Sequence, residues 1–398
     1  MNSIFTIILK FLFLSITYLL ASLSTVVLYY NTAEAQENST MYWGLSNVQE
    51  IWLANISNTS EDAEPVWLHY TDATIGYEWS ISRSWSLNMY GSAFFTNGNS
   101  ISELVGDLQG ISNIEAHEGA EILEAWLELT SQTGLRLKGG VLDSNADFDS
   151  IDPAQFFINS SHGIGPDFST VGLSGPSIFP ETGLGTIAFF EKEKWSVKLG
   201  AFDPLTRTSG SELNASSNVD WNRSDGVLIV SEVQVNTTAS TISLGMWTSS
   251  FSLEKSYTEL SNLSNAKGIY TSLSRSDTFG DTFIRLGLSD SKNAYIDRYI
   301  GAGWVKSISS NANFMPESFI GISWASARLG DLGIFSEFPR DQDNRTNLSF
   351  EHVLEISTST KLSEIVQLQP NLQFIIQPGA QSSAQSRLVV GVRGVFEI

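Results

Sequence analysis

The chain has 398 residues, of which 42% are hydrophobic and 11% aromatic, enough for a large folded unit. Charged residues make up only 16% of the sequence, below the roughly 25% usual in soluble domains, and the formal net charge of −21 argues against nucleic-acid binding. No cysteine is present, and the four histidines never stand at i, i+4 spacing, so we expect neither a metal nor a cofactor.

Residues 1–35 have the features of an export signal. Lys10 is the only cationic side chain among them, an apolar stretch runs over 11–30, and Ala33 and Ala35 form an A-x-A cleavage site. We therefore expect a signal peptide over 1–35 that is cleaved near Ala35. The apolar stretch is also long enough to span a bilayer as a helix, which keeps an uncleaved anchor as the alternative.

Residues 36–70 are predicted to form a periplasmic or plug segment that precedes the main domain. Within 43–55, Leu45, Val48, Ile51 and Trp52 stand at helical spacing, which predicts a short helical lead-in. A second stretch with this spacing, 101–108, predicts another short helix.

From about residue 71 to 398 the hydrophobic pattern has a period of two. Residues 73–81 alternate apolar and polar side chains, and the turn at 82–84 leads into a second alternating run. The pattern recurs with little ambiguity at 366–377 and 387–398. A soluble β-sandwich and a transmembrane β-barrel both produce such strands.

The export signal, the polar second face and the aromatic residues at strand ends favour the barrel, and no fixed repeat indicates a propeller or solenoid. A membrane strand with its share of loop takes roughly 20 residues, so about 330 residues give about 16 strands. We therefore predict an all-β fold, a transmembrane antiparallel β-barrel over 71–398 with a water-filled lumen.

The hairpin over 124–140 predicts the chemistry of the lumen. Ala125, Leu127 and Leu129 share the outward phase, and the opposite phase carries charged and aromatic side chains. With Leu129 opposite Leu135, Glu128 would face Arg136. The inward candidates are Glu124, Trp126, Glu128, Arg136 and Lys138. Such groups offer hydrogen bonds to sugar hydroxyls and an aromatic plane to the apolar face of a sugar, although a salt-bridge ladder that stiffens the wall is the simpler explanation.

The C-terminal strands add further lumen candidates by phase. These are Glu355, Gln369, Gln373 and Arg393. The glutamines predict either a neutral hydrogen-bonding track for sugars or simply a wet barrel wall that needs polar side chains.

Several segments resemble the carbohydrate-selective porin family (OprB) of bacterial outer membranes. The resemblance spans about 42–398, although over 205–315 only the pattern of alternating strands is similar. It is carried by 113–116, 122–129, 135–140, 156–166, 351–362, 366–379 and 388–396. It implies a 16-stranded barrel that passes sugars passively across an outer membrane.

The sequence therefore predicts an outer-membrane porin for small carbohydrates. Two alternatives stay open, a general cation-preferring porin and an exported β-rich carbohydrate-binding surface protein. No G-x-S-x-G, P-loop or H-E-x-x-H motif is present, so no enzymatic activity is expected. The expected partners are small sugars, outer-membrane lipid and the assembly machinery of that membrane, with no nucleic acid, and the protein is expected to be a monomer or homotrimer.

Overall fold

The computed structural model describes residues 39–55, 65–171, 175–204, 226–251, 266–290, 294–308, 317–330 and 350–398. The chain divides into two units, Met1–Thr40 and Met41–Ile398. The predicted signal peptide lies outside the described residues. Of the first unit only Ser39 and Thr40 are described, and the second unit is the barrel.

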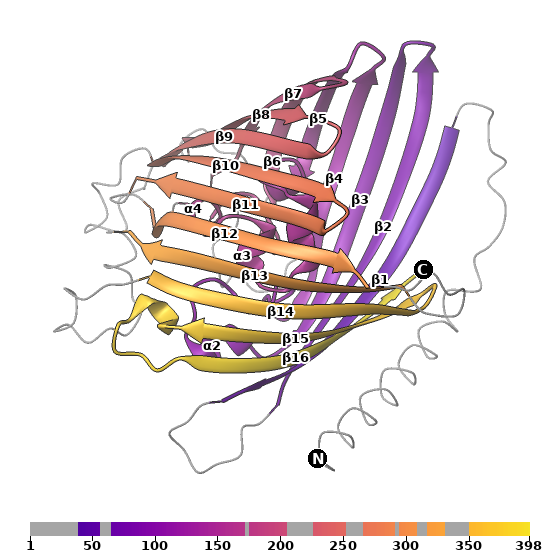
Figure 1. Ribbon diagram of the computed structural model, residues 1–398. Helices are drawn as coiled ribbons and strands as arrows, with labels where there is room; N and C mark the ends of the chain where they lie inside the picture. Colours follow the sequence, from indigo (N-terminus) through magenta and orange to yellow (C-terminus); the bar gives the residue numbers. More distant parts are fainter. Residues whose placement is uncertain are drawn as a thin grey trace. The chain divides into compact units, whose positions relative to one another are not determined.

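Sixteen strands in the described residues form one closed antiparallel barrel, in which each strand pairs with its neighbours in sequence and the first pairs with the last (Figure 1). The strands are β1 (Ser39–Ala54), β2 (Val66–Ser82), β3 (Trp85–Gly98), β4 (Gly119–Ser131), β5 (Leu135–Leu142), β6 (Gly183–Lys192), β7 (Trp195–Phe202), β8 (Gly226–Asn236), β9 (Ser240–Phe251), β10 (Ala266–Asp277), β11 (Gly280–Ser289), β12 (Ile296–Ser307), β13 (Ser318–Leu329), β14 (Phe350–Ser363), β15 (Val366–Ile376) and β16 (Arg387–Glu397). The predicted architecture and strand number are confirmed.

The predicted helical lead-in over 43–55 is wrong, because these residues belong to β1. The strand pairs with β16 from Ser46 opposite Glu397 to Ala54 opposite Val389, and so closes the barrel. The described parts of 36–70 are thus β1 and the start of β2, and the barrel begins before residue 71. The inward side chains of β1 include Val48 and Trp52, which are buried in an apolar cluster. Both faces of β1 therefore carry apolar residues, the period of two is lost, and a helical spacing arises by coincidence.

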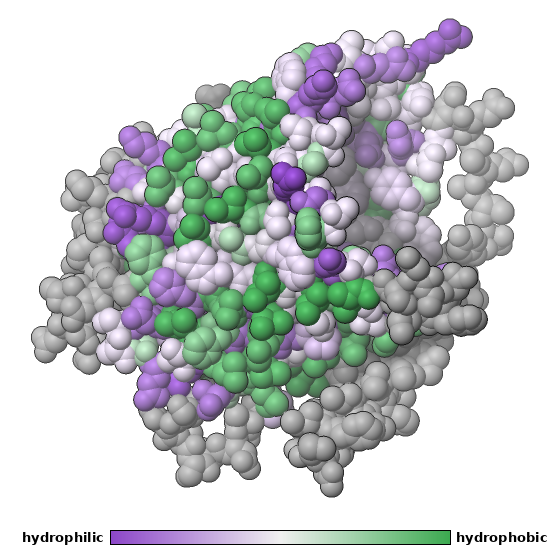
Figure 2. Space-filling view, in the orientation of Figure 1, coloured by the Kyte–Doolittle hydropathy of each residue, from purple (hydrophilic) through white to green (hydrophobic). Residues whose placement is uncertain are grey.

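The outward face of the barrel is apolar, as the alternation predicted. Leu127, Leu199 and Met246 are each more than half exposed near the middle of their strands. Figure 2 shows hydrophobic side chains over much of the visible strand surface. A continuous apolar outer surface on a closed barrel is typical of a barrel that faces lipid. Among the described residues, no helix is long and apolar enough to cross a bilayer.

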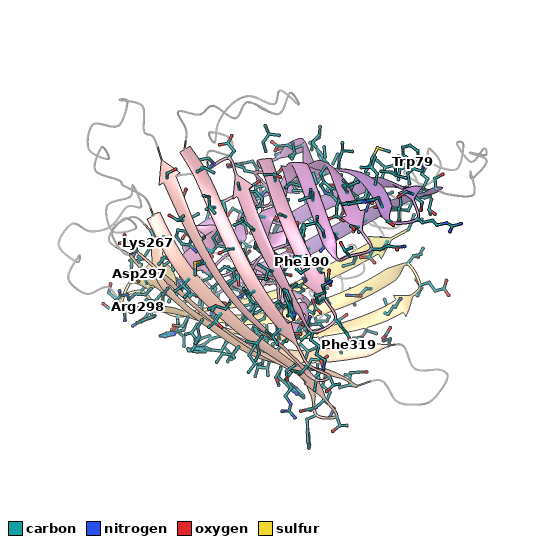
Figure 3. The ribbon with its side chains drawn as sticks, turned by 90° about the horizontal axis from the view of Figure 1, so that it is seen from above. Trp79, Phe190, Lys267, Asp297, Arg298 and Phe319 are labelled. Carbon is teal, nitrogen blue, oxygen red and sulfur yellow. The ribbon has the colours of Figure 1, made fainter. Side chains whose placement is uncertain are left out.

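Charged and aromatic residues border this apolar surface at its ends. Figure 3 places Lys267 and Arg298 at one end of the barrel and Trp79 toward the other end. At that other end, two-residue turns such as 83–84 and 193–194 join the strands. Short turns at one end and longer loops at the other are typical of outer-membrane barrels.

Inside the barrel, buried aromatic residues lie opposite glycines of the neighbouring strand. A Cβ atom at any of these glycines would overlap the ring, so each ring lies flat over the partner strand only because that strand has no side chain there. The described pairs are Trp52 with Gly391, Phe202 with Gly185, Trp247 with Gly268, Tyr270 with Gly245, and Phe283 with Gly303.

Gly391→Ala is expected to destabilise the barrel, because the added methyl group would meet the buried indole of Trp52. Overpacking of this kind costs about 1–3 kcal/mol. The midpoint of urea unfolding in detergent measures it. Gly139→Ala is the matched control, since the nearest atom to a Cβ there is 3.8 Å away, an ordinary contact. Equal midpoints for the two variants would contradict the ring-over-glycine packing.

Candidate functional site: the lumen

Two loop segments fold into the barrel and narrow its lumen. The first, 99–118, lies between β3 and β4 and contains the short helix α2 (Ile101–Val105). The second, described over 143–171 and 175–182, lies between β5 and β6 and contains η2 (Ser144–Ala146), η3 (Asp152–Phe156), α3 (Ser160–Gly163) and α4 (Pro166–Ser169). We refer to them as the first and second inner segments. The helix expected over 101–108 is thus present over the shorter range of α2.

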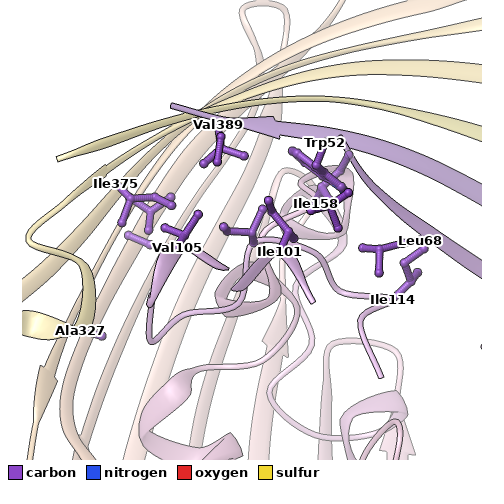
Figure 4. Packing of buried hydrophobic residues seen from close by; sticks show 14 of the residues in the cluster. Trp52, Leu68, Ile101, Val105, Ile114, Ile158, Ala327, Ile375 and Val389 are labelled. Carbon is purple, nitrogen blue, oxygen red and sulfur yellow. The ribbon is translucent and has the colours of Figure 1, made fainter. Parts of the chain in front are cut away.

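Apolar packing attaches both segments to the wall. In the first, Ile101 and Val105 pack with Trp52, Ile375 and Val389 (Figure 4). The sequence forms α2 because Ser100 accepts a hydrogen bond from the Glu103 N–H at the start, and Gly106 ends the helix in the left-handed conformation.

In the second inner segment, Phe148 and Phe168 pack against the wall residues Phe202, Trp247 and Tyr270. The ring of Phe168 stacks on those of Trp247 and Tyr270, with centroids 5.8 and 5.9 Å apart. Because these wall rings lie flat over glycines, they provide a smooth apolar surface on which the segment rests.

Arg393 and Glu351 fasten the first inner segment. Arg393 pairs with Glu50 across the seam between β16 and β1, and its Nη2 donates to Asn113 Oδ1 at 2.5 Å. The Glu351 carboxylate accepts the N–H groups of Leu108, at 2.9–3.0 Å, and of Gly379, at 2.7 Å. Arg393 therefore points inward, as its phase predicted, and contacts an inner segment.

Glu355, Gln369 and Gln373 fasten the second inner segment. Glu355 accepts the N–H groups of Ile158 and Asn159 at 2.8 and 3.1 Å, and Gln369 donates to Phe156 O at 2.7 Å.

Gln373 connects the two inner segments, because it accepts from Asn159 Nδ2 at 3.0 Å and donates to Ile111 O at 2.8 Å. Glu355 and Gln373 are fully buried and Gln369 is 5% exposed. All three face inward as predicted, but the inner segments cover them and they do not form a track open to water.

Arg285 on β11 is the main polar attachment of the second inner segment. Its guanidinium is 3.1 Å from Asp149 Oδ1 and donates to the carbonyl oxygens of Ser161, His162, Gly163 and Asp149. Its side chain is only 1% exposed.

Glu232 on β8 complements this attachment. Its carboxylate accepts from Asp149 N at 3.0 Å, from Lys198 Nζ at 2.8 Å and from Tyr270 OH at 2.9 Å. Neither Arg285 nor Glu232 was predicted from the sequence. A usable signal was present, because Arg285 stands alone between the outward residues Ile284 and Leu286, and Glu232 is likewise flanked by outward residues.

The inner face of β3–β6 carries partly exposed rings beside ion pairs. The rings of Tyr90 and Trp126 stack with centroids 5.0 Å apart, and Lys138 Nζ lies 4.3 Å from the Trp126 ring centroid. Lys138 also pairs with Asp147 at 2.9 Å and with Glu124 at 3.9 Å. We call Tyr90, Glu124, Trp126, Arg136 and Lys138 the aromatic wall. Four of its five members were predicted, and Tyr90 was not.

The predicted pairing of the hairpin was wrong by two residues. Leu129 lies opposite Leu137, and Glu128 lies opposite Lys138. The reason is the position of the turn, which occupies 132–134 with Gly134 at φ 92°, so that the hairpin is centred on Thr133 and not on Gln132. A shift of two residues keeps every side chain on its predicted face. Glu128 still contacts Arg136 diagonally at 3.1 Å, and the Arg136 guanidinium lies 4.1 Å from the Phe189 ring centroid.

Buried carboxyl groups of the second inner segment have raised pKa values. Burial raises the pKa of Asp143 to about 6 against the opposing effect of the Asn145 N–H, and burial raises the pKa of Asp149 to about 6 against the opposing effect of Arg285. Burial and the nearby Asp149 raise the pKa of Asp167 to about 8. Among the described residues, no group of three or more His, Asp or Glu side chains is placed to hold a metal ion.

The fold and this narrowed lumen define a porin-type barrel. The family model of the carbohydrate-selective porin, OprB family, matches residues 84–397, and the chain belongs to this family. The match confirms the resemblance seen in the sequence. No match was found among curated protein sequences.

Solved porins share the fold. A high-pH structure of Pseudomonas putida OprB has a TM-score of 0.71 at 16% identity, covering 90% of this chain and 94% of that one. An anion-selective porin from Comamonas acidovorans has a TM-score of 0.56 at 10% identity, covering 90% and 100%. OmpF of Salmonella typhi, in a complex with daunomycin, has a TM-score of 0.56 at 9% identity, covering 92% and 100%. At these identities the likeness concerns the fold. The family and the fold place the protein among the porins of outer membranes.

Proposed function

We propose that this porin passes small carbohydrates by diffusion along the aromatic wall, between the strands β3–β6 and the inner segments. The observation that carries the proposal is the combination of stacked, partly exposed Tyr90 and Trp126 rings with the adjacent Lys138, Arg136 and Glu124. Aromatic planes suit the apolar faces of sugars, and charged groups suit their hydroxyls. The protein acts as a channel and has no enzymatic role.

The remaining members of the predicted site have a different proposed role. Glu355, Gln369, Gln373 and Arg393 hold the inner segments, and through them fix the width of the lumen. We further propose that the chain is exported with cleavage near Ala35 and that it interacts with outer-membrane lipid and the assembly machinery, as a monomer or homotrimer.

Swelling of liposomes that contain the purified barrel tests the function. Neutral monosaccharides should enter faster than neutral amino acids of similar mass, because the aromatic wall favours sugar rings. Equal rates for sugars and amino acids would contradict the proposal and indicate a general porin.

The general cation-preferring porin remains the second candidate, because most of the cations on the inward face are paired with carboxylates. Five inward cations pair with carboxylates in the described residues: Arg136, Lys138, Lys198, Arg285 and Arg393. They therefore add no positive excess that would attract anions. The reversal potential in a salt gradient distinguishes this candidate from a pore without ion preference.

Trp126→Ala and Arg136→Ala are expected to weaken the block of single-channel current by sugars while the barrel still folds. The barrel should still fold because its strand pairing does not involve these side chains, and Arg136, whose side chain is 31% exposed, is open to water on one side. Glu128→Gln should lower the cation preference modestly, since one carboxylate is one of many charges in the pore. Trp195→Ala, an outward tryptophan of β7, is the matched control. If all variants showed the same sugar block as the unmodified protein, the hairpin would form part of the barrel wall without contributing to sugar selectivity.

A further inference from the structure

Asp167 in α4 is a buried carboxyl group without a hydrogen-bond partner. Its side chain is fully buried, and neither carboxyl oxygen makes a hydrogen bond to another described residue. The carboxyl group lies directly on the backbone of Gly287 in β11, where a Cβ atom would overlap it. A bulkier residue at position 287 would therefore push α4 away from the wall.

The Asp167 carboxyl group converges with that of Asp149. A Cβ atom at Gly165 would lie 2.7 Å from Asp167 Oδ1 and 3.2 Å from Asp149 Oδ2, so both groups meet over this glycine. The Gly165 N–H donates to Asp149 Oδ2 at 2.8 Å. Only the Asp149 carboxylate thus has a polar partner at this point.

The groups packed around Asp149 and Asp167 supply one unpaired positive charge, which neutralises only one of the two carboxylates. Arg285 of β11 neutralises Asp149, and Lys198 of β7 neutralises Glu232 of β8. The other titratable groups that face the pair are His162 of α3, Tyr270 of β10 and Tyr299 of β12. Burial, together with Arg285, lowers the pKa of His162 to about 3, so this histidine is neutral and supplies no second cation.

A protonated Asp167 suits this position and an ionised one does not. Burying an unpaired charge is costly, whereas a neutral carboxyl group tolerates an apolar contact much better. The pKa of about 8 for Asp167 has the same origin, burial first and the Asp149 charge second. At neutral pH the cluster of Asp149, Asp167 and Arg285 therefore carries no net charge.

We propose that Asp167 holds the second inner segment against β11 only while its carboxyl group is protonated, so that its ionisation releases the segment and widens the pore. The inference rests on the proposed channel but does not depend on which solutes the channel prefers. Asp167 is a positioning residue, because it acts on permeation through the segment that narrows the lumen.

The direction of the pH effect follows from proton linkage. With the segment in place the pKa of Asp167 is about 8, and after release it returns to its ordinary value of about 4. Between pH 6 and 8, above the pKa of about 6 of Asp143 and Asp149, the attached form binds one proton more than the released form, so the release equilibrium rises about tenfold per pH unit as the pH increases. Above pH 8 it stops changing.

The experiment is single-channel conductance in salt alone between pH 6 and 9. Conductance of the unmodified protein should rise with pH and level off above pH 8, whereas Asp167→Asn, which mimics the protonated group, should keep the low value throughout. Asp152→Asn removes an exposed carboxylate of the same inner segment and should behave like the unmodified protein.

Limited proteolysis provides a readout that needs no variant. Cleavage within 143–171 of the unmodified barrel should rise over the same pH range. The proposal would be overturned if neither the conductance nor the cleavage of the unmodified protein rose with pH. It would also be overturned if Asp167→Asn kept the full rise in conductance. Sugar entry into liposomes at pH 6 tests the proposed function separately, because Asp167 is protonated there.

Discussion

Leu372→Arg should prevent most of the protein from reaching the folded, heat-modifiable state. Leu372 lies near the middle of β15 and points outward, opposite Val390 of β16 and Ile356 of β14. An arginine on the lipid face of a membrane barrel costs about 2–4 kcal/mol near the midplane. Urea titration of the protein folded into lipid vesicles measures this loss, and Val392→Arg should behave similarly.

Gln367→Arg is the control for this change, because Gln367 lies on the same strand, faces inward and is partly exposed. It should leave assembly nearly intact. Gln373 does not serve this purpose, although the sequence pattern places it on the same inward face. It is buried beneath both inner segments, so an arginine there should disturb them. Equal damage from Leu372→Arg and Gln367→Arg would contradict the assignment of the two faces.

Arg285→Ala should detach the second inner segment while the barrel itself persists. The substitution leaves the Asp149 carboxylate buried without its cation and removes the donor to four backbone carbonyl groups. Breaking a buried ion pair by removing one partner costs about 3–5 kcal/mol. Limited proteolysis should then cut within 143–171, and the cut protein should keep its heat-modifiable mobility because the strand pairing is unchanged.

Arg275→Ala provides the comparison, since the Arg275 side chain is 60% exposed and pairs with Asp277 at the surface. Such a pair contributes about 0–1 kcal/mol, and no new cleavage is expected. An Arg285→Ala protein as resistant to protease as the unmodified one would show that apolar packing alone holds the segment.

Most of the aromatic wall could be predicted because local alternation fixes which face a side chain occupies. Trp126, Arg136 and Lys138 are on the predicted face even though the pairing of their hairpin was wrong by two residues. Tyr90 was missed because its ring contributes to the site only through stacking on Trp126 across a strand pair. Contact between strands depends on the turn geometry, which the alternation does not contain.

The contacts that attach the inner segments to the barrel could not be predicted from the sequence, for a related reason. Glu355 contacts residues nearly 200 positions away in the chain, and Gln373 contacts both inner segments. A polar residue in the inward phase has the same local pattern whether water or a folded loop covers it. The pattern therefore identified these residues as inward-facing but not as buried.

The sequence by itself determined the class of fold, the approximate number of strands, the lipid-facing and lumen-facing sides of most strands, and the family. These features follow from a period of two that is repeated over more than 300 residues, because one side of each strand faces lipid and the other faces a polar interior. The tertiary structure decided the strand β1, the path of the inner segments, and the cluster of Asp149, Asp167 and Arg285. Each of these depends on the inner segments, which replace water by protein on part of the inner wall, so that apolar, neutral and charged side chains there all become buried.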